Sequence, residues 1–219
     1  MGLRGQVWHG LGRQLRNPTG WAGRLVGRMM RIANRRPTRL ALDALAIRPG
    51  DRLLDLGCGS GQAIRAMTRR ARAGWVHGFD QSAVMIGQAR RLNRRALATG
   101  RVQLTAGDFA ALPYPPGSFD GILASNVIYF WPDRPAMLAQ LRALLAPGGR
   151  LSIYATDAQS MRRWKFAQED THSHITALEL RHALLAAGFG PDDIAINLHE
   201  MGGGVIGIVG HAVRTDPAA

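Results

Sequence analysis

The chain has 219 residues and carries 28 Lys and Arg against 15 Asp and Glu, a formal net charge of +13. This length suits one α/β domain or at most two small ones, and the charge is compatible with nucleic acid, anionic membrane or acidic substrates without selecting any of them. The single cysteine, Cys58, excludes an intramolecular disulfide and a cysteine-based metal site, and we expect an intracellular, cytoplasmic protein.

The N-terminal region is basic, with nine arginines ahead of the first acidic residue, Asp43. Apolar residues at helical spacing predict an amphipathic helix over 19–34, which Pro37 should end, and a second helix over 38–46. Nothing here has the apolar length of a signal peptide or a membrane span. We predict a helical extension or lid over residues 1–48 and one domain over residues 49–219. A solvated cap, a lid, a membrane-facing surface and a surface that pairs two chains all stay open for the extension.

After residue 50, strand-length apolar runs alternate with helical segments. Strands are predicted over 52–56, 75–80, 102–108, 119–126 and 150–156, with helices over 63–71, 82–96 and 134–149 between them. This alternation predicts βαβ units and a parallel sheet covered on both faces. A further helix over 177–187 and two strands over 193–198 and 205–213 form a hairpin-type ending.

The segment LLDLGCGSG, Leu53 to Gly61, places a glycine-rich loop directly after the first strand. A Walker-type phosphate loop needs Lys and Ser or Thr after its last glycine, but Gln62 and Ala63 stand there. The dinucleotide fingerprint needs a glycine at Gln62. Asp55, just before the loop, would oppose a pyrophosphate and suits a ligand with a cationic amine.

DLGCGSG resembles the first motif of the class I S-adenosylmethionine (SAM) methyltransferases, an acid followed by three alternating glycines. Asp80 at the end of the second strand and Asp108 at the end of the third match further acids of that family. SFDGILASNVIYFWPD, LRALLAPGGRLSIY and LLAAGF resemble its later segments, so the resemblance runs from about residue 51 to 213. It implies a Rossmann-like α/β fold, with a mostly parallel seven-stranded sheet in the order 3-2-1-4-5-7-6 and helices on both faces.

The resemblance also implies SAM as cofactor and S-adenosylhomocysteine as product. Asp55 would help to hold the amino end of the cofactor, Asp80 would accept both ribose hydroxyls, and Asp108 would meet the adenine amino group. Helix capping by Asp80 and a turn role for Asp108 are the structural alternatives. The expected cofactor-binding residues are Asp55, Gly57, Cys58, Gly59, Gly61, Asp80, Gln81, Met85, Asp108, Phe109 and Asn126.

Methyl transfer depends mainly on alignment, and a base matters chiefly for a hydroxyl or an acidic carbon acceptor. The catalytic candidates are His172, His174 and Tyr129. Two histidines without a third ligand do not predict a metal site. Aromatic side chains beside imidazoles suit a flat or apolar acceptor. The expected substrate contacts are Trp8, His9, Tyr129, Phe130, Trp164 and Phe166.

We therefore expect methyl transfer to an O, N or C atom of a small molecule, as in quinone C-methyltransferases and natural-product methyltransferases. One alternative is a membrane-peripheral phospholipid or quinone methyltransferase that docks through its basic N-terminus. Another is a SAM-binding protein with different chemistry, such as isomerisation or cyclisation. Nucleic acid is not expected as the acceptor, because the fourth strand ends in SNVIYF rather than in the Asn/Asp-Pro-Pro-Tyr/Phe of base methyltransferases.

Overall fold

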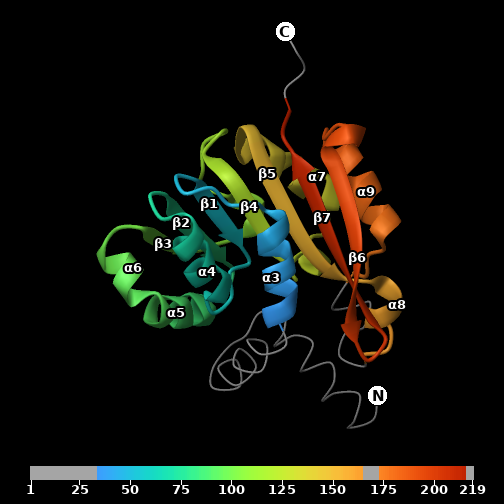
Figure 1. Ribbon diagram of the computed structural model, residues 1–219, viewed down its shortest axis with the longest axis horizontal. Helices are drawn as coiled ribbons and strands as arrows, with labels where there is room; N and C mark the ends of the chain where they lie inside the picture. Colours follow the sequence, from blue (N-terminus) through green and yellow to red (C-terminus); the bar gives the residue numbers. More distant parts are fainter. Residues whose placement is uncertain (1–33, 165–172, 216–219) are drawn as a thin grey trace.

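The computed structural model describes residues 34–164 and 173–215, which form a seven-stranded sheet in the order β3-β2-β1-β4-β5-β7-β6 (Figure 1). Strands β1 to β5 run parallel, whereas β7 lies antiparallel to both β5 and β6. The predicted fold class and strand order are confirmed. The strands are β1 Arg52–Leu56, β2 Trp75–Asp80, β3 Val102–Ala106, β4 Phe119–Ser125, β5 Leu145–Thr156, β6 Ile194–Gly202 and β7 Val205–Val213.

Helices cover both faces of the sheet, as two separate apolar cores show. Leu53 of β1 packs with α3, α4 and α5, and its neighbour Leu54 packs with α7 and α9, because successive strand residues point to opposite faces. In Figure 1, α3 lies in front of the sheet and α7 behind it. The helices are α3 Arg35–Ala44, α4 Gln62–Arg70, α5 Ala83–Leu92, α6 Arg94–Ala98, α7 Arg134–Leu144, α8 Ala158–Met161 and α9 Ala177–Ala186. None of the helices in the described ranges is long and apolar enough to cross a bilayer.

Three predicted helix boundaries are wrong. Helix α3 begins at Arg35, and Pro37 lies in its first turn, where a backbone N–H has no intrahelical acceptor to lose. The helix predicted over 82–96 is broken at Asn93, whose Nδ2 donates to the carbonyls of Gly61 and Ala89. The helix predicted over 134–149 ends at Leu144, and the Pro-Gly-Gly segment lies inside β5. The helix predicted over 19–34 lies outside the described residues.

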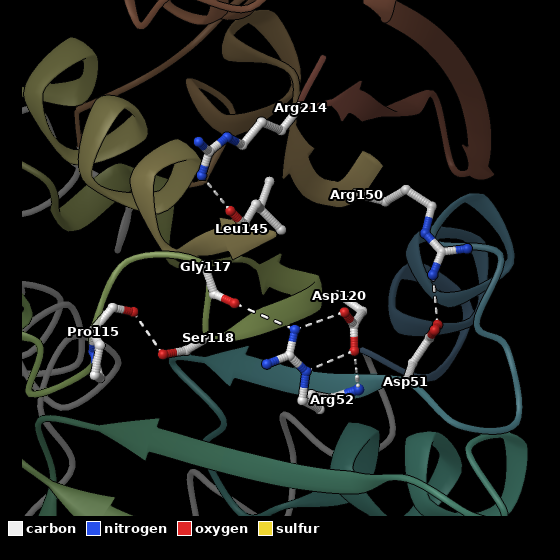
Figure 2. Close-up of polar contacts among 9 residues, drawn as sticks. All are labelled: Asp51, Arg52, Pro115, Gly117, Ser118, Asp120, Leu145, Arg150 and Arg214. Carbon is white, nitrogen blue, oxygen red and sulfur yellow. Dashed lines mark hydrogen bonds and ion pairs between the residues drawn. The ribbon is translucent and has the colours of Figure 1, made fainter. Parts of the chain in front are cut away.

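Acidic side chains at the amino ends of the strands are paired with arginines (Figure 2). Arg52 and Asp120, at the starts of β1 and β4, form a fork with Nε–Oδ2 and Nη2–Oδ1 distances of 3.0 and 2.9 Å. The hydrogen bonds from Arg52 lower the pKa of Asp120. Nearby, Arg150 Nη2 lies 2.5 Å from Asp51 Oδ2, and both side chains are only 8% exposed. Asp51 and Asp120, the acids at this end of the sheet, are therefore both paired with arginines.

The Arg150–Asp51 pair should be important for stability. Replacing Arg150 with Met leaves the buried Asp51 carboxylate without its counter-charge, so the free energy of unfolding should fall by about 3–5 kcal/mol. Urea denaturation measures this change. The matched control is Arg39→Ala, which removes an exposed pair whose side chains are 81% and 52% exposed, and it should cost at most about 1 kcal/mol. Equal losses in the two variants would contradict this assignment.

Candidate functional site

A cavity of about 460 Å³ opens at the carboxyl ends of β1, β2 and β4. The chain leaves β1 toward α4 on one face of the sheet and leaves β4 toward α7 on the other. Neighbouring parallel strands whose connections diverge in this way leave a crevice between them, which is where open α/β sheets bind ligands. The predicted residues that line the cavity are Asp55, Gly57, Cys58, Gly59, Asp80, Gln81, Met85, Phe109, Asn126 and Phe130.

The glycine loop is held against the end of β2 by backbone hydrogen bonds. The amides of Gly57 and Cys58 both donate to the carbonyl of Phe79, at 2.8 and 3.1 Å. Gly59 N donates to Asp80 Oδ2 at 2.8 Å. The loop is therefore fixed in place by the strand that follows it.

The three loop glycines have positive φ angles but different surroundings. A Cβ on Gly57 would lie 2.7 Å from Val127, and one on Gly61 would lie 2.6 Å from Asn93 Nδ2. Gly61 caps α4 and does not line the cavity. No atom lies within 4 Å of the corresponding point at Gly59, whose φ is +51°. Gly57 and Gly61 thus permit close packing within the protein, while Gly59 leaves open space beside the cavity.

Asp80 is positioned by backbone amides. Its Oδ2 accepts from Gly59 N and its Oδ1 accepts from Ser82 N, each at 2.8 Å. The residue that caps α5 is Ser82, whose side chain accepts from Met85 N. Burial raises the pKa of Asp80, and the two amide hydrogen bonds offset part of this shift. Each carboxylate oxygen retains acceptor capacity for a ligand.

Asp55 is a buried side chain of the site with an unsatisfied oxygen. It is 2% exposed, and its Oδ2 has no hydrogen-bond partner among residues 34–164 and 173–215. Burial raises its pKa to about 8, and the charge of Asp80 adds to this effect. The hydroxyl of Ser125, at the end of β4, is likewise buried without a partner in those ranges. The cavity therefore presents polar atoms of Asp55 and Ser125 that form no hydrogen bond with the described residues.

Asp108 lies beside the cavity without lining it. The side chain is exposed, and its Oδ1 accepts from Gln81 Nε2 at 3.3 Å and from Ala110 N at 3.0 Å. It caps the short 3-10 helix Phe109–Ala111, in agreement with the turn alternative. Gln81, which donates a hydrogen bond to Asp108, and Phe109, the next residue in the chain, both line the cavity. This arrangement leaves Asp108 Oδ2 available at the rim.

Asn126 adopts φ +57° after β4, and Tyr129 holds its side chain. The Tyr129 hydroxyl donates to Asn126 Oδ1 at 3.2 Å and accepts from Thr156 N. Burial raises the pKa of Tyr129 above its ordinary value, so the phenol stays protonated at neutral pH. Its side chain does not line the cavity. The contacts of Tyr129 are those of a residue that positions Asn126.

Two of the other predicted catalytic and substrate residues, His174 and Trp164, are described by the structure, and four are not. Trp8, His9, Phe166 and His172 lie outside the described residues. His174 and Trp164 do not line the cavity, and Trp164 packs against the core on the α7 side. No group of three His, Cys, Asp or Glu that could hold a metal occurs in the described ranges.

Sequence reasoning missed part of the lining. Ser125 could have been found from its position at the end of a predicted strand. The α3 and α4 residues carry no motif, and only the packing of the two helices brings them to the cavity. The missed residues include Asn34, Arg35, Thr38, Arg39, Leu42, Ala63, Ala66, Arg69, Arg70, Ser125 and Val127.

The raised pKa of Asp55 should be visible in the stability of the ligand-free protein. Between the ordinary aspartate pKa of 3.8 and about 8, the folded chain holds a proton on Asp55 that the unfolded chain has lost. Stability from this group is therefore lost as the pH rises through that window. Relative to Asp55→Asn, the wild type should become less stable from pH 5 to about 8, as measured by urea denaturation at several pH values. The exposed control Asp192→Asn should follow the wild type. Parallel curves for the wild type and Asp55→Asn would show that Asp55 is ionised throughout.

Comparison with known proteins identifies the family. Residues 53–149 match a family model described as a methyltransferase domain. The chain is 39% identical over 110 residues to the 27-O-demethylrifamycin SV methyltransferase of Amycolatopsis mediterranei (strain S699), covering 50% of this chain and 40% of that protein. It is 35% identical over 179 residues to the nocamycin O-methyltransferase of Saccharothrix syringae, covering 69% and 63%. The match therefore spans less than two thirds of either relative.

A solved structure supports the same fold. The crystal structure of the [4+2]-cyclase SpnF superposes with a TM-score of 0.68 at 20% identity, over 82% of this chain and 81% of that chain. At this identity the likeness concerns the fold. Together with the sheet order and the matched methyltransferase domain, these findings show that the chain belongs to the class I S-adenosylmethionine-dependent methyltransferases.

Proposed function

We propose that this chain transfers the methyl group of SAM to a small-molecule acceptor. The observation that carries the proposal is the buried carboxyl group of Asp55 at the cavity, whose Oδ2 has no hydrogen-bond partner within residues 34–164 and 173–215. A cationic amino group would supply the missing donor and the missing counter-charge together, since an ammonium group is a donor only. Asp55 would hold the amino end of the cofactor, and Asp80 would accept the ribose hydroxyls with its remaining acceptor capacity.

The adenine end of the cofactor would lie near Gln81, Phe109 and Asp108. Phe109 is 6% exposed and lines the cavity, so its ring is available for apolar contact with the base. Asp108 Oδ2 is the proposed acceptor for the adenine amino group. Gly59 leaves room for the close approach of the ribose and methionine portions.

Catalysis would rest on alignment. When bound, SAM supplies an activated methyl group that an acceptor atom can attack directly. The protein would hold the two reactants in line and exclude water with Val127 and Phe130, which both line the cavity. Tyr129 is protonated and hydrogen-bonded to Asn126 and Thr156, which is unsuited to the role of a base. A base from His172 or His174 remains part of the proposal only for acceptors that must lose a proton.

We propose a natural-product-like acceptor, because the named relatives act on rifamycin and nocamycin compounds. The extension over residues 1–48 is proposed to cover the site, since Arg35, Thr38 and Arg39 of α3 already line the cavity. The phospholipid or quinone alternative requires the extension to contact a membrane. The alternative of non-methyl-transfer chemistry stays open, because SpnF has the same fold and is named a cyclase.

The test is transfer of an isotopically labelled methyl group. The full chain is incubated with labelled SAM and pools of phenolic, amine and lipid acceptors, and both the labelled product and S-adenosylhomocysteine are measured. We expect label in one small-molecule pool, and no transfer by Asp55→Asn. Transfer that requires anionic vesicles would favour the lipid alternative. SAM binding without transfer to any pool would favour the non-methyl-transfer alternative.

Gly59 provides a test of the cofactor position. Gly59→Ala adds a methyl group beside the cavity and should weaken SAM binding by at least about tenfold, a change of ~1.4 kcal/mol. Gly117→Ala is the matched control, because Gly117 has φ +72° and equally open surroundings but does not line the cavity. Both substitutions should cost about 1–2 kcal/mol of stability, since each places a Cβ in left-handed backbone. Calorimetric titration with SAM measures the difference. Equal affinities in the two variants would remove Gly59 from the cofactor contact.

A further inference from the structure

A second cavity, of about 470 Å³, lies between α4 and the junction of α5 and α6. We call it the arginine groove, because Arg65, Arg69, Arg91, Arg94 and Arg95 all line it. Among the described residues, its lining contains neither a carboxylate nor an aromatic side chain. The groove therefore concentrates positive charge in a concave site, which is the electrostatic arrangement that attracts anions.

The five groove arginines make no side-chain hydrogen bond or ion pair with the described part of the chain. Within residues 34–164 and 173–215, none of their guanidinium groups donates a hydrogen bond or forms an ion pair. Other arginines of the same region are used: Arg70 pairs with Asp43, and Arg101 donates to the carbonyls of Thr68 and Ala71. The contrast separates structural arginines from arginines that are free to bind a ligand.

The free arginines also repel one another. No Asp or Glu occurs in α4, α5 or α6, so these helices provide no local neutralisation. Arg65 and Arg69 are four residues apart on α4, and like charges at this spacing destabilise a helix. A bound anion would relieve this repulsion, which the described part of the chain leaves uncompensated.

We propose that the arginine groove binds the phosphate or pyrophosphate group of a small molecule. Guanidinium groups bind phosphate oxygens in a bidentate manner. Several guanidinium groups around one site offer more hydrogen-bond donors than a single carboxylate can accept. The absence of an aromatic side chain in the lining argues for recognition of the phosphate rather than of a nucleobase, which would be stacked.

The groove adjoins the cofactor site. Arg69 lines both cavities, and Asn93 of the groove donates through Nδ2 to the carbonyl of Gly61 in the glycine loop, at 3.1 Å. A phosphate held here would anchor the anionic end of a phosphorylated acceptor near the cofactor. This use of the groove rests on the proposed function, whereas phosphate binding itself does not.

The test is calorimetric titration of the full chain with inorganic pyrophosphate. The groove variant is Arg65→Gln with Arg95→Gln, which removes one exposed guanidinium from each wall. The control is Arg48→Gln with Arg72→Gln, which removes the same charge from two exposed arginines outside the groove. The wild type and the control should bind alike, and the groove variant should bind at least about tenfold more weakly. Thermal unfolding should show that both variants stay folded, with the groove variant no less stable than the wild type, because the substituted side chains are exposed and Arg65→Gln removes a like-charge pair from α4.

Three results would overturn the proposal. Failure of the wild type to bind pyrophosphate would show that the groove is no phosphate site. Equal weakening in the groove variant and the control would assign the effect to net charge. Capture by phosphatidylglycerol vesicles without binding of pyrophosphate, lost in the groove variant, would make this face a membrane contact. S-adenosylhomocysteine binding, measured on the same proteins, reports separately on the proposed function.

Discussion

The carboxyl group of Asp55 is buried with no ion-pair partner among the described residues, and the site is organised around this constraint. Removing a carboxylate from water is costly unless it is paired, and a chain with a net charge of +13 has many arginines that could pair with it. At the amino ends of the strands, Asp51 and Asp120 are both paired with arginines. At the carboxyl ends, Asp55 and Asp80 form no ion pair with the described residues, and Asp80 is held only by backbone amides. The acidic side chains at one end of the sheet are thus paired with arginines, whereas Asp55 and Asp80 at the other end form no ion pair with the described residues.

The fold provides this division through the divergence of β1 and β4. Their connections leave toward opposite faces of the sheet, so the cavity opens where both strands end. The surrounding contacts then fix its shape: Asp80 holds the amide of Gly59, close packing at Gly57 positions the loop against Val127, and Tyr129 holds the side chain of Asn126. None of these contacts needs a ligand, so the site is preorganised before one binds. The arginine groove lies next to the cavity along α4. Its guanidinium groups also have no ion-pair partner among the described residues.

Much of this structure could be predicted from the sequence because it depends on local periodicity. The alternation of strands and helices, the placement of Asp55 and Asp80 at strand ends, and the glycine loop all follow from residues close together in the chain. The misplaced boundaries depend on longer-range effects. Asn93 ends a helix because its side chain reaches Gly61, 32 residues away, and Pro37 is tolerated because it falls in a first turn. The contribution of α3 to the cavity could not be predicted, because it results from packing between elements with no shared pattern. Tyr129 was expected at the substrate, but its hydrogen-bond partners could be known only from the structure.

The most direct test of the role of Asp55 is calorimetric titration of the full chain with SAM at pH 7, in two buffers of different ionisation enthalpy. With a ligand-free pKa of about 8, Asp55 is largely protonated at this pH and must ionise to pair with the amino group of the cofactor. Binding with a net release of protons, seen as a difference between the two observed enthalpies, is the predicted result. Binding with the same corrected enthalpy and no proton exchange would mean that Asp55 does not meet the cationic end of the cofactor. Absence of binding would contradict the assignment of the cavity as the SAM site.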